Sequence, residues 1–168
     1  MMNGIYLLLG SNLGRREFNL TGALDLIENR IGRIKNASGT YKTEAWGVKD
    51  QNWFLNQAVE VETNLSPTDL LSKINLIENE MGRVRKERWR ERIIDIDILY
   101  YHDLVFQDNN LTIPHPGIPV RRFALMPLVE IASRFIHPIE QKSQLQLLQE
   151  CPDQLAVERS DQATPSIG

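Results

Sequence analysis

Two aspartates follow a run of basic residues in the middle of the chain, and this junction points most clearly to chemistry. Residues 83–92 read RVRKERWRER, and Asp95 and Asp97 come next among branched apolar residues. This pattern predicts a strand with both carboxylates on one face and isoleucines on the other, because side chains alternate along a strand. Carboxylates suit Mg²⁺, and arginines bind phosphate oxygens bidentately. The junction therefore predicts a site for Mg²⁺ and a nucleoside triphosphate.

Each half of the junction also has an ordinary structural interpretation. A D-x-D pair can lie on a solvated strand face, and a basic run is typical of an exposed helix or loop. The two together, at this separation, support a functional site as well as they support the structural interpretation. Neither zinc nor a phosphate-binding glycine loop is indicated: the three histidines are scattered, and residues 10–14 lack the Gly-Lys-Ser/Thr ending. We expect residues 10–14 to form a tight turn, so side chains must hold the phosphates.

Length and composition set the class of protein. The chain has 168 residues, 42% of them hydrophobic and 24% charged, which fits one globular domain over 1–168 with a polar tail from about residue 154. Its net charge of −3 argues against a general nucleic-acid binder. Cys151 is the only cysteine, which fits a reducing compartment. No apolar run suits a signal or a membrane span, and no exposed apolar stripe demands a dimer. We therefore expect a cytoplasmic monomer that binds neither nucleic acid nor a membrane.

Two strand–helix–strand units are predicted to position the site. Strands are expected at residues 5–9, 34–41, 54–62 and 93–101. The helices between them carry apolar stripes and end at Gly32 and Gly82, and the second begins at the capping pair Ser66-Pro67. The order β-α-β-β-α-β is that of a ferredoxin-like α+β fold, an antiparallel sheet with two helices on one face.

The chain after Tyr101 adds further elements to this core. Residues 111–116 read as an extended segment that its prolines keep out of a central strand. A helix is expected over residues 121–132, interrupted at Pro127, and another near 143–150. The last fifteen residues are polar and are expected to fray.

A second group of residues could bind a flat heterocycle. Phe54 and Asn56 share one strand face, so a ring could stack on the first while its polar edge bonds the amide of the second. Phe123, after two arginines, is another aromatic candidate, although aromatics at such positions are commonly core residues. His115 is held between two prolines and could contact a phosphate or be an ordinary surface histidine.

Eight segments, taken in their order and spacing, resemble a known family. They are Gly10–Gly14, Tyr41–Glu44 with Gly47, Phe54–Asn56, Gly82–Arg85, Glu87–Trp89, Arg92 with Asp95–Ile98, Pro114–Pro116 and Arg121–Phe123. This set is similar to the 6-hydroxymethyl-7,8-dihydropterin pyrophosphokinase family of folate biosynthesis over residues 5–132. The resemblance implies a ferredoxin-like core and the transfer of pyrophosphate from ATP to the hydroxymethyl group of the pterin, with release of AMP.

The resemblance also implies a role for each matching residue. Asp95 and Asp97 would hold two Mg²⁺ ions that bridge the phosphates, and Arg83 and Arg92 would be the catalytic arginines. The residues implied to contact ATP are Asn75, Glu78, Arg83, Arg85, Arg88, Trp89, Arg92, Ile98, Thr112, His115 and Arg121. The residues implied to contact the pterin are Thr43, Trp46, Phe54, Asn56, Asp95 and Phe123, with the two phenylalanines on either side of its ring.

Some positions depart from the family's usual pattern. The most consequential is Arg90-Glu91, which replaces a common Gly-Pro and should alter the flexibility of a loop that must close. Ala45, Asn75 and Ile93 replace a common proline, glutamine and threonine. We expect the change at Arg90-Glu91 to affect the rate and not the chemistry, and none of these changes to abolish the activity.

Two other functions fit parts of the sequence. A palm-type nucleotidyl transferase or cyclase also places paired aspartates on a ferredoxin-like sheet, but it leaves Phe54, Asn56 and Phe123 without a role. An RNA-binding ferredoxin-like module would need exposed aromatics on a basic sheet face. The two aspartates instead make this region acidic.

Overall fold

A computed structural model describes residues 2–43, 53–82 and 93–160. The elements along the chain are β1 (Ile5–Ser11), α1 (Arg16–Arg30), β2 (Arg33–Ala37), β3 (Tyr41–Thr43), β4 (Phe54–Glu62), α2 (Pro67–Glu80), β5 (Asp95–Tyr101), β6 (Phe106–Gln107), β7 (Thr112–Ile113), the 3-10 helix η1 (Ile118–Val120), α3 (Arg122–Ala132), α4 (Gln144–Glu150) and β8 (Val157–Arg159).

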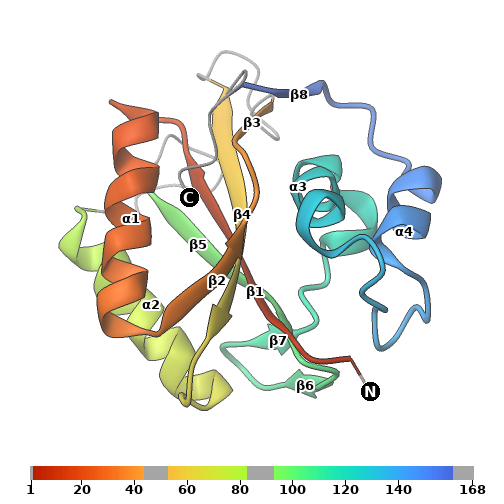
Figure 1. The fold of residues 1–168 in the computed structure, drawn as a ribbon, viewed down its shortest axis with the longest axis horizontal. Helices are drawn as coiled ribbons and strands as arrows, with labels where there is room; N and C mark the ends of the chain where they lie inside the picture. Colours follow the sequence, from red (N-terminus) through yellow and green to blue (C-terminus); the bar gives the residue numbers. More distant parts are fainter. Residues whose placement is uncertain (1, 44–52, 83–92, 161–168) are drawn as a thin grey trace.

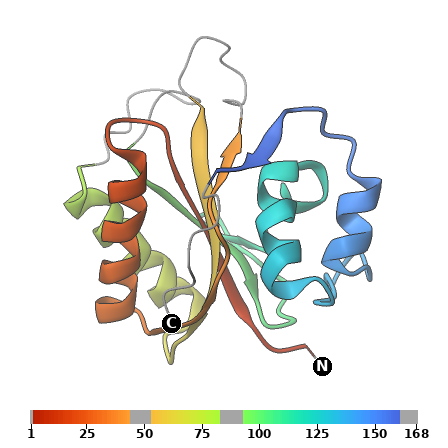
Figure 2. The ribbon, with the colours of Figure 1, turned by 45° about the horizontal axis from the view of Figure 1, so that its top comes forward.

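The main sheet confirms the ferredoxin-like topology. Its strands run β5-β1-β4-β3-β8, with β2 also paired to β4, and all the pairings are antiparallel. When β2 and β3 are counted as one strand, the two predicted units have four strands. Across the sheet, the fourth strand of the chain lies next to the first, followed by the third and then the second. Helices α1 and α2 lie together on one face of this sheet, as Figures 1 and 2 show.

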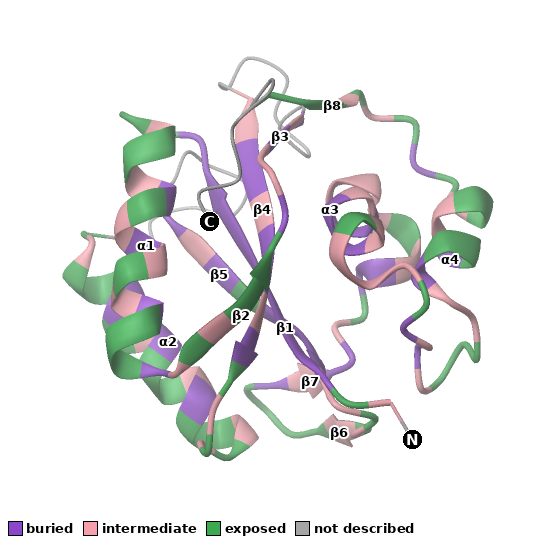
Figure 3. Cartoon of the chain, viewed as in Figure 1, coloured by how far each residue is buried: buried purple, intermediate pink, exposed green. Residues whose placement is uncertain are grey.

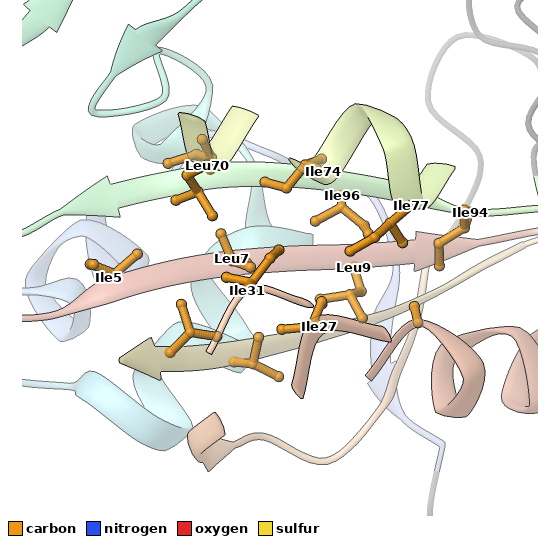
Figure 4. Packing of buried hydrophobic residues seen from close by; sticks show 14 of the residues in the cluster. Ile5, Leu7, Leu9, Ile27, Ile31, Leu70, Ile74, Ile77, Ile94 and Ile96 are labelled. Carbon is orange, nitrogen blue, oxygen red and sulfur yellow. The ribbon is translucent and has the colours of Figure 1, made fainter. Parts of the chain in front are cut away.

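Two apolar clusters hold three layers together. Leu7 and Leu9 of β1 pack toward α1 and α2 in the first cluster (Figure 4), while Tyr6 and Leu8 enter a second cluster with α3 and α4. Strand β1 is therefore buried along its whole length, whereas β2 is largely exposed (Figure 3). The C-terminal helices predicted as additions thus cover the opposite face of the sheet from α1 and α2.

The strand expected near 34–41 is two strands. From Ala37 to Tyr41 the chain advances four positions while β4 advances three, from Val59 to Asn56. Ser38 spans the break: its N–H donates to the Ala58 carbonyl, and its hydroxyl oxygen accepts the Ala58 N–H. Both short strands can therefore pair with β4 while the chain bends between them.

The predicted interruption of a helix at Pro127 is wrong, because α3 runs through it from Arg122 to Ala132. Proline removes one backbone N–H, so the helix forgoes the hydrogen bond that would reach the Phe123 carbonyl. The ring of Pro127 is buried with Leu125 and Leu128, and this packing offsets the loss.

The tail expected to fray from about residue 154 instead carries β8. This strand pairs with β3, with Val157 opposite Thr43 and Arg159 opposite Tyr41. Its three residues have no apolar pattern of their own, so its order depends on a strand far away in the sequence.

The two helix ends with glycine look alike in sequence and differ in structure. Gly82 ends α2 with φ of +86°, a left-handed conformation that favours glycine. Gly32 after α1 is not left-handed, and a Cβ atom there would collide with the carbonyl oxygen of Glu62. Ser66 caps α2 as predicted, accepting the Asp69 N–H at 3.2 Å.

Candidate active site

Four neighbouring strands bring the candidate residues to one row across the sheet. The register places Asp95 opposite Gly10, Gly10 opposite Asn56, and Asn56 opposite Tyr41. Residues opposite each other in antiparallel strands project to the same face, so these side chains share a face. Asp97 lies opposite Leu8, which packs in the cluster beneath α3 and α4. The row therefore lies on the sheet face that is turned toward α3.

The predicted alternation along the aspartate strand is confirmed. Ile94, Ile96 and Ile98 are buried against α1 and α2, while Asp95 is partly buried and Asp97 is exposed. Among the described residues no group of three or more histidine, cysteine, aspartate and glutamate side chains could hold a metal ion. A cation held by Asp95 and Asp97 would therefore need water or substrate oxygens, or residues outside the described ranges, to complete its shell.

Glu78 supports this strand from its outer edge. Strand β5 has β1 on one side only, and the Ile96 N–H on the other side donates to Glu78 Oε2 at 2.9 Å. Glu78 is only 5% exposed, so the bond forms inside the protein, where an unpaired N–H would be costly. Helix α2 thereby fixes the strand that presents both aspartates.

Asn56 is held in one orientation by its neighbours. Its Oδ1 accepts a hydrogen bond from the Thr43 hydroxyl at 3.0 Å, and its Nδ2 donates to the Leu9 carbonyl at 3.3 Å. Asn56 is 5% exposed. Each group of the amide still has one further hydrogen-bonding position among the described residues: a lone pair on Oδ1 and a hydrogen on Nδ2. Asn56 can therefore present an acceptor and a donor side by side.

Gly10 makes room for this amide. A Cβ atom at Gly10 would lie 2.6 Å from Asn56 Nδ2, closer than side chains tolerate. Gly10 was predicted to lie in a turn, whereas it lies in β1, and the nearby left-handed residue is Gly14 with φ of +71°. Glycine within a strand commonly marks such a close approach, which is the signal that could have identified it.

The two candidate phenylalanines come from different layers. Phe54 is partly buried on β4, two residues before Asn56 and on the same face. Phe123 is partly buried at the second residue of α3 and packs beside the second apolar cluster. The Arg121 guanidinium carbon lies 5.7 Å from the centre of the Phe123 ring. The structure thus supplies one aromatic ring from the sheet and one from the helix that covers it.

A cleft of about 250 Å³ borders Asp97. Its walls include the apolar residues Leu71, Ile98 and Leu111 and the polar residues Asp97, Thr112 and His115. Four of these were predicted; Leu71 and Leu111 were missed because they look like ordinary members of apolar runs. A cleft that offers both apolar and polar groups suits a small planar ligand with a charged tail.

His115 is a neutral hydrogen-bond donor in this cleft. Its Nδ1 accepts the Gly117 N–H at 3.0 Å, which leaves the hydrogen on Nε2. Burial, and secondarily the nearby Arg121 charge, lower the pKa of His115 to about 4. His115 therefore stays uncharged at neutral pH.

The structure groups the described candidates into two sets. Asp97, Ile98, Thr112 and His115 line the cleft, with Arg121 close enough to His115 to affect its pKa. Asn56 and Asp95 lie in the row across the sheet, Thr43 and Phe54 form the next pair on the same face, and Phe123 comes from α3. Asn75 and Glu78 lie on α2 and do not line the cleft. The predictions on Trp46, Arg83, Arg85, Arg88, Trp89 and Arg92, and the departures at Ala45 and Arg90-Glu91, fall outside the described residues. No helix of the described chain is both long and apolar enough to span a bilayer.

Comparisons with known proteins show which family this chain resembles. Residues 6–133 match the profile of 7,8-dihydro-6-hydroxymethylpterin-pyrophosphokinase (HPPK). The 2-amino-4-hydroxy-6-hydroxymethyldihydropteridine pyrophosphokinase of Methylorubrum extorquens is 44% identical over 132 residues, 78% of this chain and 84% of that protein. The Aquifex aeolicus protein of the same name is 41% identical over 141 residues, 84% of this chain and 88% of that protein.

A solved structure shows the same fold in a longer chain. Wild-type HPPK-DHPS of Plasmodium falciparum superposes with a TM-score of 0.69 at 20% identity. The match covers 88% of this chain and 43% of that one, so this chain spans less than half of the Plasmodium protein.

Proposed function

The chain belongs to the 7,8-dihydro-6-hydroxymethylpterin-pyrophosphokinase family, and from this premise we propose how its residues divide the work of the reaction. The reaction transfers pyrophosphate from ATP to the hydroxymethyl group of 6-hydroxymethyl-7,8-dihydropterin in folate biosynthesis and releases AMP. One observation carries the proposal: the strand register sets Asp95 and Asn56 on either side of Gly10. Asp95, a proposed metal ligand, and the amide of Asn56 therefore lie on one face of the sheet, where the two substrates can meet.

Asp95 and Asp97 are the proposed metal ligands. They are oxygen donors two residues apart on a strand that α2 fixes through Glu78, and this donor set fits Mg²⁺. We propose two ions, as the resemblance implies; when bound, they neutralise phosphate charge and align the reacting groups. For Glu78 itself we propose a positioning role through β5.

The cleft beside Asp97 is the proposed nucleotide site. Leu71, Ile98 and Leu111 offer apolar surface to the base, and Thr112 lies beside them. Neutral His115 can donate its Nε2 hydrogen to a phosphate oxygen, and Arg121 contributes a positive charge nearby. Contact between ATP and Asn75, or between ATP and the arginines and tryptophan of residues 83–92, stays a prediction from the resemblance.

The row across the sheet is the proposed pterin site. The free donor and acceptor of the Asn56 amide match a heterocycle edge that offers one acceptor and one donor, and Thr43 holds that amide in place. Phe54 from the sheet and Phe123 from α3 are the proposed stacking partners of the pterin ring. Trp46 is proposed as a further contact on the resemblance alone.

The chemistry is a displacement at phosphorus. The hydroxymethyl oxygen of the pterin bonds to the β-phosphorus of ATP, the bond from that phosphorus to the α,β-bridging oxygen breaks, and the hydroxyl loses its proton. Such transfers depend mainly on positioning and charge neutralisation. Asp95 lies between the two substrate sites and can hold the reacting ends together. Arg83 and Arg92 are the proposed groups that offset charge on the transferred phosphates.

The direct test is chromatography of adenine nucleotides after incubation with ATP, Mg²⁺ and 6-hydroxymethyl-7,8-dihydropterin. We expect AMP that forms only when the pterin is present. Formation of ADP would indicate a simple kinase, and release of free pyrophosphate would indicate a nucleotidyl transferase; either result contradicts the proposal. We propose that the enzyme acts as a cytoplasmic monomer, which its single cysteine and ordinary composition support.

A further inference from the structure

The segment Asp153–Arg159, here termed the C-terminal strap, joins two layers of the molecule. In Figures 1 and 2 it runs from the end of α4, past α3, to β8 at the edge of the sheet. It lies beyond residue 133, where the match to the family profile ends. Its two ends are fastened by different contacts.

The first end of the strap holds the start of α3. Asp153 Oδ2 accepts the Arg122 N–H at 3.0 Å, and Asp153 Oδ1 accepts the Leu155 N–H at 2.9 Å. Arg122 is the first residue of α3, which has no side-chain cap of its own at Arg121. A carboxylate at a helix N-terminus is favourable for the helix dipole. Asp153 is only 9% exposed, so this contact is protected from water.

The other end of the strap holds β3 and returns to α3. Strand β8 pairs with β3, and the Arg159 guanidinium lies 3.3 Å from a carboxylate oxygen of Glu130 on α3. Glu130 also accepts the Tyr41 hydroxyl at 2.7 Å and the Gly39 N–H at 3.1 Å. The Arg159 guanidinium carbon lies 5.7 Å from the centre of the Tyr41 ring. Glu130 is thus the point where helix, β3 and strap meet.

The contacts at both ends of the strap lie next to the proposed pterin residues. Arg122 immediately precedes Phe123, and Val157 lies opposite Thr43, whose hydroxyl holds Asn56. Helix α3, with Phe123, and the sheet at β3 and β4, with Thr43, Phe54 and Asn56, are the two walls between which the pterin would lie. We propose that the C-terminal strap sets the separation of these walls, with Asp153 and Arg159 as positioning residues for the pterin. This inference rests on the proposed assignment of Phe54, Asn56 and Phe123 to the pterin.

The strap should act on one substrate more than on the other. The nucleotide cleft is built from α2, β5 and the segment 110–116, and no residue of the strap lines it. Arg121 of the nucleotide side directly precedes Arg122, so a change at Asp153 can also reach it. Arg159 is far from that junction in the sequence and contacts β3 and Glu130, and it gives the cleaner test.

The experiment compares Arg159→Ala and Asp153→Ala with the parent chain. The dissociation constant of 6-hydroxymethyl-7,8-dihydropterin is measured in the presence of an ATP analogue with an α,β-methylene bridge, which cannot react. The dissociation constant of that analogue is measured separately, and so is the unfolding temperature. Lys142→Ala is the matched control, because it removes a surface ion pair with Glu150 in the same C-terminal region.

We expect Arg159→Ala and Asp153→Ala to weaken pterin binding about 5-fold to 10-fold, and Arg159→Ala to change nucleotide binding less than about 2-fold. Asp153→Asn should recover part of the loss, since an amide oxygen can still accept one of the two N–H groups. Lys142→Ala should match the parent. If Arg159→Ala lowers the unfolding temperature to that of the assay, Glu130→Gln replaces it, because this variant weakens the same ion pair from the side of α3.

The inference is overturned if folded Arg159→Ala weakens both ligands equally or neither. Asn56→Ala separates this failure from a failure of the proposed function. If Asn56→Ala weakens pterin binding and Arg159→Ala does not, only the role of the strap is wrong. If Asn56→Ala leaves pterin binding unchanged, the proposed pterin site is wrong and the strap loses its role as well.

Discussion

The proposed pterin side and the proposed metal side of the site are built in different ways. On the pterin side, Thr43, Asn56 and the Leu9 carbonyl form a buried hydrogen-bonded set that the fold itself completes. On the metal side, Asp95 is partly buried and Asp97 is exposed, and the ligand shell of an ion held by them needs atoms from elsewhere. A hydrogen-bonded set that the fold completes can select a substrate before it binds. A metal ligand shell that the protein leaves incomplete is completed by the substrate itself. Substitutions on the two sides should therefore affect different kinetic constants.

The largest effect is expected on the metal side. Asp97→Asn removes a charge that metal binding needs, and kcat should fall by at least about 10³-fold. Asp97 is exposed, so the free energy of unfolding should change by less than about 0.5 kcal/mol. Rates of AMP formation over a Mg²⁺ titration check the first expectation, and denaturant unfolding checks the second. A variant within about tenfold of the parent rate would contradict the metal role.

Asn56→Ala should affect the pterin side almost alone. It removes the amide that faces the pterin and leaves the buried Thr43 hydroxyl without its acceptor. We expect KM for the pterin to rise about 100-fold, KM for ATP to stay within about 2-fold, and the free energy of unfolding to fall by about 1–3 kcal/mol.

Gln57→Ala is the matched control for Asn56→Ala. Gln57 is the next residue of β4, it points away from the row, and its amide bonds the Ser38 carbonyl at 2.7 Å. Steady-state kinetics with each substrate varied in turn should show no selective change for this variant. An equal rise in pterin KM for both variants would mean that the effect comes from β4 and not from the Asn56 amide.

Local features of the fold were predictable from the sequence, and features set by distant partners were not. Ser66, Pro67 and the apolar stripe of α2 act within a few residues, so the helix was found at its place. The row of Asp95, Gly10 and Asn56 depends on the register of three strands, which no local pattern encodes. Strand β8 escaped prediction because only its pairing with β3 orders it.

The candidate site was predictable to the extent that its residues form motifs. Asp95 and Asp97 alternate with isoleucines and were correctly placed on the face opposite to them. Gly10 looked like a turn residue, because a close approach by a side chain from another strand leaves no trace in its own segment. Glu78 was matched to the nucleotide by resemblance alone, and its hydrogen bond to Ile96 could only come from the packing of α2 on β5.

The pKa of His115 tests whether the metal side, in the cleft beside Asp97, also contains a polar group whose state the fold fixes before a ligand binds. Burial lowers its pKa to about 4, below the usual 6.5, so the unfolded chain binds more protons between these values and stability falls as pH falls through this window. From pH 7 to pH 5 this residue should cost about 1–2 kcal/mol of unfolding free energy. His115→Asn keeps an acceptor for Gly117 but cannot titrate. Denaturant unfolding at both pH values should show a smaller acid loss for this variant; an equal loss would contradict the shifted pKa.

The smallest expected effect comes from Gly10→Ala. The added Cβ would press on Asn56 Nδ2 and turn the amide, raising KM for the pterin about 5-fold with little change for ATP. Gly22→Ala is the control. Gly22 lies within α1, and a Cβ atom there would lie 3.6 Å from Met81 Cε, an ordinary contact. Alanine at this position should stabilise the helix by about 0.5–1 kcal/mol. Kinetics and thermal unfolding of both variants check this. If Gly10→Ala binds the pterin as the parent does, the orientation of the Asn56 amide is not held rigidly, which would contradict a preformed pterin side.

The contact between Thr40 and Ser160 joins residues 120 positions apart, and it has a consequence for the order of folding. Contacts of such long separation form late, because closing the intervening chain has a high entropic cost. During synthesis, at about 5–20 residues per second, the two strand–helix–strand units emerge well before residue 159 does. The nascent chain can thus acquire its sheet and its first apolar cluster while the pterin walls are still unbraced. If the strap has the proposed role, the ability to bind the pterin should be the last property that the growing chain gains.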